Sequence, residues 1–396
     1  MEFLVTKQEL EARISRLCIA ISDRRPDWDT AIIINRINQY YFTGTMQDGL
    51  LVVKKSGTVK YFVRRSYERA IKESPLHSIY PMHSYRDIAQ VIGEDFGNTL
   101  IETETVTISI LERLKKYFHI KHMYSIENIV FGVRAVKSPY ELYWMKEAGK
   151  QHSLLLNEVA PSILREGMSE VDFTAELYKK MLKMGHHSVA RFYSYQTEII
   201  AGQVAFGENS NVPTNMDSPG GMKGMCPAVP IIGSRERLLK KGDLVFVDVG
   251  FGLYGYHTDR TQVYMFGSNP SDELVRAHRK CIEIEKKAAE LLKPGNIPSE
   301  IYNKLMDDLD SDFLNNFMGF GDRKVKFLGH GIGLHIDEQP VIANSYNSPL
   351  QENMVIALEP KKGIAGVGMV GVEDTYIVTP VGGQCITGGE RDIIVI

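Results

Sequence analysis

Four acidic residues stand inside or at the end of apolar runs that are typical of buried strands. They are Asp248 in LVFVDVGF, Asp259 in GYHTDRTQVYMF, Glu359 at the end of MVIALEP, and Glu373 in MVGVEDTYIV. A buried carboxylate without a partner is costly, and two side by side are worse unless a cation lies between them. The chain must therefore fold so that these acids meet cations, and this requirement restricts its architecture.

The first two acids are expected on one hairpin. Asp259 follows Asp248 by eleven residues, across a glycine- and tyrosine-containing turn. If the two strands pair, both carboxylates can point to the same face near the turn. His330, in the glycine-rich segment GHGIGLHIDEQP, is a fifth candidate ligand. Taken singly, each has a structural alternative, because acids in strands are often paired with Lys or Arg and a histidine beside glycine is often structural.

As a set, these residues favour a metal site. Two Asp, one His and two Glu are hard ligands suited to a pair of divalent ions, with Mn²⁺ expected first and Co²⁺, Fe²⁺ or Zn²⁺ as alternatives. Two such ions, about 3.5–4 Å apart, acidify a water between them. Thiolate ligation is not expected, because Cys18, Cys226, Cys281 and Cys385 are widely spaced with no CxxC. They indicate reduced thiols and a cytoplasmic protein.

Composition excludes several partner classes. The chain has 396 residues, with 46 basic and 49 acidic side chains and a formal net charge of -3. This balance gives no electrostatic argument for binding nucleic acid or an anionic membrane. The N-terminus lacks the apolar core of a signal peptide. No run approaches the roughly 20 apolar residues of a membrane span.

The length predicts two domains. In the first part, helices are expected at 5–22, 66–73, 85–93 and 107–118, and strands at 31–36, 40–45, 49–55 and 59–65, an α/β alternation. In the second part, helices are expected at 139–159, 168–184, 271–293 and 298–311. Ser138 is the predicted cap of the first of these, with Glu141 completing a capping box, and Ser271 leads the third. The irregular stretch 208–233 is expected to be a lid or binding loop, or disordered.

The motifs DVGFGLYGYHTD, GHGIGLHIDEQP, ENMVIALEP and GVEDTYIVT resemble, in order, those of the "pita-bread" metalloenzymes: methionine aminopeptidase, Xaa-Pro aminopeptidase, prolidase and creatinase. The resemblance implies a creatinase/prolidase-like α/β N-terminal domain, residues 1–132, plus an α+β pita-bread catalytic domain, residues 133–396. It also implies a homodimer. The metal ligands that it implies are Asp248, Asp259, His330, Glu359 and Glu373.

The chain departs from the pattern of this family at positions that handle substrate. The family peptidases carry a second histidine seven residues after the ligand histidine, where this chain has Asp337. His335 stands two residues earlier, and it would project to the same side as Asp337 if the segment is extended. A family histidine in the loop before residue 242 has no counterpart, and a prolidase arginine is replaced by Gly371. Because an ionised Asp337 only accepts hydrogen bonds, we expect a more anionic pocket than that of a dipeptidase.

Two roles are open for Asp337. It is either a general base near the metals, or it forms a salt bridge or caps a turn while His335 does the work of the missing histidine. Four further residues are candidates for substrate binding, each with a structural alternative. They are Tyr256, which lines the pocket or packs the hairpin, His187, which enters the pocket or is exposed, and Arg64 and Arg65, which reach the partner's active site in a prolidase-like dimer or are a solvated strand end.

The sequence therefore predicts hydrolysis of a C–N bond in a dipeptide or other small molecule, with Glu359 moving the proton. An Xaa-Pro dipeptidase or aminopeptidase is the leading hypothesis. One alternative is a non-peptidase hydrolase or lyase of the same fold, creatinase-like or dimethylsulfoniopropionate-lyase-like, with Asp337 as general base. Another is a non-catalytic binding protein that retains the fold.

Overall fold

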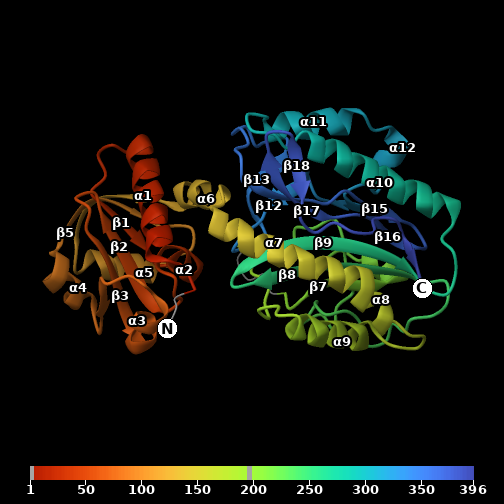
Figure 1. Ribbon diagram of the computed structural model, residues 1–396, viewed down its shortest axis with the longest axis horizontal. Helices are drawn as coiled ribbons and strands as arrows, with labels where there is room; N and C mark the ends of the chain where they lie inside the picture. The colour runs from red at the N-terminus through yellow and green to blue at the C-terminus, as the bar shows by residue number, and fades with distance from the viewer. Residues whose placement is uncertain (1–3, 194–198) are drawn as a thin grey trace. The chain divides into compact units, whose positions relative to one another are not determined.

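The computed structural model describes residues 4–193 and 199–396. The chain divides into two compact units, Met1–Arg134 and Ala135–Ile396, coloured red to orange and yellow to blue in Figure 1. The units are taken in turn below, because each has its own sheet system and its own core.

A mixed sheet forms the centre of the first unit, with the strand order β4-β3-β2-β1-β5-β6. β1 pairs antiparallel with β2 and parallel with β5. The strands are β1 (Thr30–Ile33), β2 (Asp48–Lys54), β3 (Val59–Arg65), β4 (Ile79–Pro81), β5 (Asp95–Ile101) and β6 (His119–Ser125). The helices are α1 (Lys7–Arg24), α2 (Arg36–Thr43), α3 (Tyr67–Glu73), α4 (Tyr85–Ile92), α5 (Ile108–Lys115) and α6 (Glu127–Ala135).

One element of this unit differs from the prediction. Within the segment 40–45, expected as a strand, residues 40–43 belong to helix α2. Its start is fixed by Asn35, whose side chain accepts hydrogen bonds from the backbone N–H groups of Ile37 and Asn38, a typical N-cap. Gly44, with φ of 75°, ends the helix in the left-handed region. These two local signals outweigh the strand preference of the aromatic residues between them.

Two larger sheets form the second unit, in the orders β13-β12-β14-β17-β18 and β19-β9-β8-β7. The strands of the first are β12 (Phe327–Gly331), β13 (Glu338–Ala343), β14 (Val355–Leu358), β17 (Asp374–Thr379) and β18 (Gly382–Cys385). Those of the second are β7 (Gly202–Phe206), β8 (Leu244–Leu253), β9 (Tyr256–Met265) and β19 (Ile394–Val395). Short antiparallel pairs join β10 (Gly319–Phe320) to β11 (Arg323–Lys324) and β15 (Lys361–Ile364) to β16 (Gly368–Gly371).

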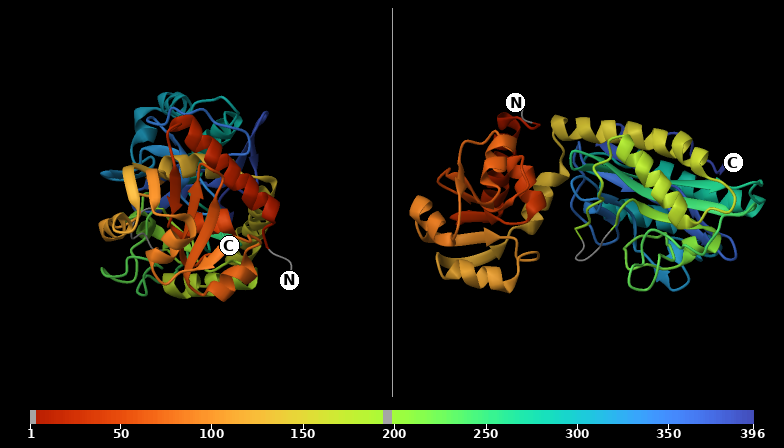
Figure 2. Two further views of the ribbon diagram at one scale, coloured as in Figure 1. Left: turned by 90° about the vertical axis from the view of Figure 1, so that its left-hand side faces the viewer. Right: turned by 90° about the horizontal axis from the view of Figure 1, so that it is seen from below.

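Helices pack against these sheets. They are α7 (Pro139–Leu154), continued by the π-helix η1 (Leu155–Val159), then α8 (Ala160–Ile163), α9 (Glu170–Lys183), the 3₁₀ helix η2 (Gly207–Asn211), α10 (Asp272–Glu290), α11 (Pro298–Asp307) and α12 (Ser311–Leu314). α7 runs along β8 and β9, and α10 lies against β15 and β16 (Figures 1 and 2). The predicted capping box of Ser138 and Glu141 and the predicted cap Ser271 are both confirmed.

The two larger sheets meet where β9 approaches β17. Thr261 forms an isolated antiparallel bridge with Glu373. Nearby, the backbone N–H of Asp259 donates to Thr375 Oγ1 at 2.9 Å. This contact brings the acid-bearing hairpin of one sheet against the strand ends of the other.

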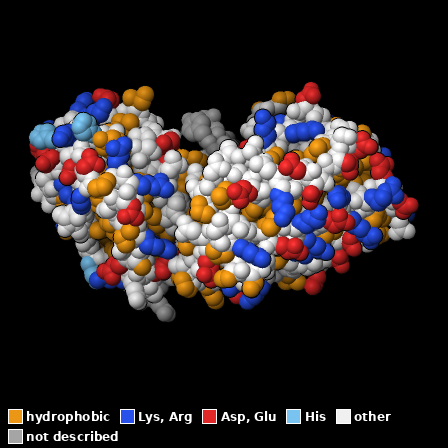
Figure 3. Space-filling view, turned by 90° about the horizontal axis from the view of Figure 1, so that it is seen from above, with side chains coloured by type: hydrophobic (Ala, Val, Ile, Leu, Met, Phe, Trp, Pro, Cys, Tyr) orange, Lys and Arg blue, Asp and Glu red, His pale blue; other side chains and the backbone are white. Residues whose placement is uncertain are grey.

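The surface carries both signs of charge. On the face shown in Figure 3, acidic and basic side chains are interspersed over the second unit. Among the described residues, the longest helices carry too many charged side chains, and too few apolar ones, to cross a membrane.

Candidate metal centre

The hairpin of β8 and β9 brings the two aspartates together. In its register Asp248 lies opposite Thr261, and Gly250 lies opposite Asp259. Residues directly opposite share a face, and residues two apart on one strand share a face. Asp248 and Asp259 therefore project to the same side near the turn, as the alternation of the sequence predicted.

The other three candidate ligands come from neighbouring strands of the second sheet. His330 lies on β12 opposite Ala357 of β14, and Glu359 directly follows β14. Glu373 was expected in the middle of a strand, but it directly precedes β17. Gly329 permits the close approach of β12 to β14, because a Cβ at that position would be 2.3 Å from a backbone oxygen of Ala357. The glycine beside His330 thus has a packing role.

The five side chains converge, and part of their arrangement has the dimensions of an ion site. His330 Nε2 is 3.5 Å from Glu359 Oε1 and 3.7 Å from Glu373 Oε1. Donor atoms of Asp259, His330 and Glu373 all lie within 4.8 Å of one another. Donors bound at about 2.1 Å to one tetrahedral ion are about 3.4 Å apart. Glu373 Oε1 is buried without a hydrogen-bond partner, so these residues fit a divalent cation.

Burial and mutual repulsion shape the charge of this centre. Burial raises the pKa of Asp259 well above its ordinary value, and the neighbouring Asp248 raises it further. Burial likewise raises the pKa of Glu373 well above its ordinary value, with Asp259 adding to the effect. Carboxylates placed this closely favour a cation between them, since ionising them together is otherwise unfavourable.

A lysine that sequence reasoning missed enters the same cluster. Lys361 is fully buried, and its Nζ donates to Asp248, Glu359 and Glu373 at 3.0, 2.8 and 2.7 Å. Burial alone would lower the pKa of Lys361, but attraction to these carboxylates outweighs burial and raises it well above its ordinary value. The spacing in the sequence could have indicated this position. Lys361 stands two residues after Glu359, and residues two apart in an extended segment point to the same side.

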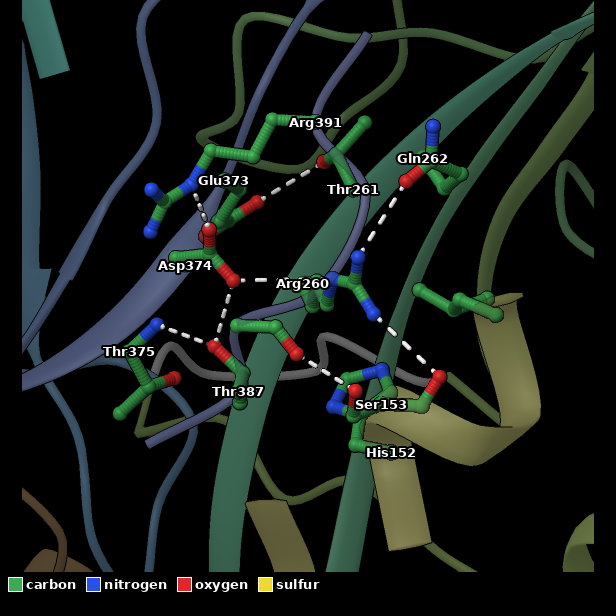
Figure 4. Close-up of polar contacts among 12 residues, drawn as sticks. His152, Ser153, Arg260, Thr261, Gln262, Glu373, Asp374, Thr375, Thr387 and Arg391 are labelled. Carbon is green, nitrogen blue, oxygen red and sulfur yellow. Dashed lines mark hydrogen bonds and ion pairs between the residues drawn. The ribbon is translucent and has the colours of Figure 1, made fainter. Parts of the chain in front are cut away.

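A polar network supports Glu373 from behind (Figure 4). Thr261 Oγ1 donates to Glu373 Oε2 at 3.1 Å. The next residue, Asp374, points to the other side of the strand, where its Oδ2 accepts from Arg391 Nε at 2.8 Å. Its Oδ1 accepts from the Thr387 hydroxyl at 2.8 Å and lies 3.5 Å from Arg260 Nε. Glu373 and Asp374 thus belong to two adjacent polar clusters. The side chain of Glu373 lies among the other carboxylates, and that of Asp374 contacts two arginines.

The segment that carries His335 and Asp337 is bent and not extended, so the condition for the expected common direction of the two side chains is not met. Asp337 Oδ1 accepts from the backbone N–H of Tyr193 at 2.7 Å. Burial raises the pKa of Asp337 to about 6, partly offset by that hydrogen bond and by His330. His335 is buried, and its backbone N–H donates to Glu338 at 2.9 Å. Their catalytic roles stay predictions.

The histidine pair at 186–187 packs against other residues, with His186 buried and His187 half-buried. His186 is buried, and its Nδ1 accepts from the N–H of Gly252 at 3.0 Å. His187 Nε2 lies 3.1 Å from Nε2 of His257, a buried histidine of β9 to which sequence reasoning gave no role. Burial, reinforced by the neighbouring His257, lowers the pKa of His186 to about 4 and that of His187 to about 2. All three histidines therefore belong to a packed neutral cluster.

The other substrate-binding candidates have structural surroundings of their own. Tyr256 is fully buried, with its ring edge-to-face against Tyr140 at 6.2 Å between centroids. Arg64 and Arg65 are exposed at the end of β3, and Arg65 Nε lies 3.8 Å from Asp48 Oδ2. These contacts match the structural alternatives stated for them, and a substrate role for each stays a prediction.

Comparison with known protein families places the chain. Residues 143–380 match Metallopeptidase family M24. The chain belongs to this family. Residues 13–136 match the Creatinase/Prolidase N-terminal domain, so the protein has the two-domain pita-bread architecture. Membership of the M24 family implies divalent metal ions at the catalytic centre.

Individual relatives agree with this assignment. The chain is 26% identical to an Xaa-Pro dipeptidase of Pyrococcus furiosus over 368 residues, covering 92% of this chain and 95% of the relative. It shares its fold with an Xaa-Pro dipeptidase of Bacillus anthracis, with a TM-score of 0.79, 23% identity and coverage of 98% and 100%. It also shares its fold with an X-Pro aminopeptidase of Thermotoga maritima, with a TM-score of 0.75 and 23% identity, covering 96% of this chain and 99% of the other.

Proposed function

We propose that this M24 protein is a metal-dependent hydrolase of small C–N bonded substrates, with Xaa-Pro dipeptides as the first class. The observation that carries the proposal is the convergence of Asp259, His330 and Glu373 donor atoms within 4.8 Å of one another. The name of the relative from Pyrococcus furiosus supports the choice of substrate class.

The residues of the centre have different proposed roles in the reaction. A divalent ion at these ligands supplies Lewis-acid polarisation and lowers the pKa of water. We assign the proton transfer of C–N cleavage to Glu359, whose Oε2 accepts from Lys361 and whose Oε1 faces His330. Asp337, with a pKa raised to about 6 by burial, is largely ionised at neutral pH and would accept a proton or bind a cationic group of the substrate.

Release of proline tests this function. The full-length chain is loaded with Mn²⁺ and incubated with Xaa-Pro dipeptides, and free proline is measured, with dipeptides that lack proline as controls. We expect release that is lost on chelation and in Glu373→Gln, because Glu373 supplies an ion ligand. Absence of release from every Xaa-Pro dipeptide by the loaded chain would refute the peptidase assignment.

A second candidate function rests on Asp337. Its half-buried carboxyl lies close enough to His330 for the histidine to influence its pKa, so it suits a general base in a non-peptidase hydrolase or lyase, of the creatinase or dimethylsulfoniopropionate-lyase kind. This alternative predicts no proline release by the wild-type chain and some release by Asp337→His. A loaded chain that binds dipeptides without converting them would favour the non-catalytic alternative.

Three finer expectations belong to the same proposal. Mn²⁺ is proposed as the metal because the donor set is rich in oxygen. A homodimer is proposed from the creatinase/prolidase-like N-terminal domain, in which Arg64 and Arg65 would serve the partner's site. A cytoplasmic location is proposed because Cys18, Cys226, Cys281 and Cys385 are free thiols.

A further inference from the structure

The ammonium group of Lys361 occupies a position that a second cation would need. Its Nζ is 3.0 Å from Asp248 Oδ2, 2.8 Å from Glu359 Oε2 and 2.7 Å from Glu373 Oε2. A divalent ion binds such oxygens at about 2.0–2.2 Å. An ion on these three oxygens would therefore contact Nζ itself. The lysine and a metal ion cannot share them.

The two glutamates divide their oxygens between two cation positions. Oε2 of Glu359 and Oε2 of Glu373 both accept from Lys361. Oε1 of each glutamate faces His330 Nε2, at 3.5 and 3.7 Å. Distances of this size are too long for hydrogen bonds but suit donors around one ion. The position on the Lys361 side is filled, and the one on the His330 side, next to the unpaired Oε1 of Glu373, is open to a metal ion.

The charges agree with this division. Ionised Asp248, Asp259, Glu359 and Glu373 carry four negative charges. The Lys361 ammonium contributes one formal positive charge, and one divalent ion brings the total to about −1. A second divalent ion in addition to the lysine would leave a net positive, crowded centre, which like-charge repulsion disfavours. The lysine therefore removes the electrostatic need for a second ion.

The backbone is shaped to admit the lysine. Gly371 lies opposite Lys361 in the pairing of β15 with β16. A Cβ at Gly371 would lie 2.6 Å from Cα and 3.0 Å from Cγ of Lys361. Any side chain there would press on the lysine. Gly371, which stands where prolidases carry an arginine, thus leaves room for Lys361.

We propose that this centre holds one divalent cation, on the His330 side, and that the Lys361 ammonium is a built-in replacement for a second one. The proposal goes beyond the proposed function, because it concerns the number and kind of cations and holds for any substrate.

Metal stoichiometry tests the proposal without any activity measurement. The full-length chain is stripped, loaded with Mn²⁺, freed of excess ion and analysed by elemental mass spectrometry. We expect one ion per chain in the wild type and two in Lys361→Ala, because the three released oxygens can then bind a metal. Lys362→Ala is the matched control, since its Nζ instead donates to the carbonyl of Phe313 at 2.8 Å; it should keep one ion. Two ions or none in the wild type, or one in Lys361→Ala, would overturn the proposal.

A second measurement uses only the wild-type chain, in case Lys361→Ala does not fold. Crystals grown with Mn²⁺ are examined by anomalous scattering. We expect one peak, about 2.0–2.3 Å from His330 Nε2, with Lys361 still on its three carboxylates. Two peaks with a displaced lysine would overturn the proposal. Proline release and ion number are independent, so two ions in an active enzyme would refute this inference and leave the proposed function standing.

Discussion

Replacing Asp374 by Asn removes one charge from the network behind Glu373 and keeps the shape of the side chain. Asp374 accepts from Arg391 and Thr387, both at 2.8 Å, and lies 3.5 Å from Arg260 Nε. Asp374 and Arg260 are each only 1% exposed. Removing one partner of a buried ion pair costs about 3–5 kcal/mol, because the other charge is left unpaired at low dielectric.

Glu285 places the expected value at the lower end of this range. Its carboxyl is fully buried and lies 3.5 Å from Arg391 Nε. Burial raises the pKa of Glu285 well above its ordinary value, and the charge of Asp374 raises it further. Without that charge the pKa falls, and an ionised Glu285 would partner Arg391. An ionised Glu285 would also attract Arg260, so we expect Asp374→Asn to lower the free energy of unfolding by about 3 kcal/mol.

Urea unfolding followed by tryptophan fluorescence measures this change in the second unit alone. The chain has two tryptophans, Trp28 in the first unit and Trp144 in the second, so a Trp28→Phe background isolates the relevant signal. Asp392→Asn is the control, because the exposed pair of Asp392 and Arg279 should contribute less than about 1 kcal/mol. The reasoning is refuted if Asp374→Asn costs no more than this control.

Three further predictions follow from the structure. Because burial holds the pKa values of His186 and His187 at about 4 and about 2, below the ordinary 6.5 or so, the unfolded chain binds more protons at acid pH. The contribution of these two histidines to the free energy of unfolding should be highest above pH 6.5 and fall by up to about 1.4 kcal/mol per histidine per pH unit from 6.5 towards 4. Urea titrations of the wild type and of His186→Gln/His187→Gln at several pH values measure this contribution, and equal slopes for the two chains would contradict it. Gly371→Ala should lower the free energy of unfolding by at least about 2 kcal/mol, since the residue has φ of 136° and the added Cβ would be 2.4 Å from a carbonyl oxygen; an unchanged urea midpoint would count against it. A thiol reagent should label exposed Cys226 in the native chain but reach buried Cys281, whose thiol pKa is raised by burial, only after unfolding; mass mapping of early labelling at both sites would disprove it.

Local signals explain why much of this architecture could be predicted. The capping residues Ser138 and Ser271 and the alternation that puts Asp248 and Asp259 on one face depend on a few neighbouring residues. The convergence of His330 with Glu373 depends on which strands pair. The order of the motifs along the chain predicted this convergence only through their resemblance to a family. The roles of the five residues as metal ligands remain predictions.

The features that were missed depend on distant packing. Lys361 looks like an ordinary charged residue at a strand end until Asp248, more than a hundred positions earlier, is placed beside its Nζ. For His187, entry into the pocket and exposure were both open, because nothing in its own segment shows that His257 packs against it. The helix at 36–43 was missed although its cap at Asn35 is a local signal, because the aromatic residues after the cap favour a strand.

The hairpin of β8 and β9 makes some insertions far more damaging than others. Along β9, Asp259 faces the carboxylate cluster while its neighbour Arg260 faces Asp374. Shifting one strand by a single position would exchange these two side chains, placing a guanidinium among the ligands and a carboxylate among the arginines. We therefore expect an insertion of one residue within β9, between the turn and Asp259, to be far more damaging than one at residues 254–255, where a longer loop keeps the strands paired.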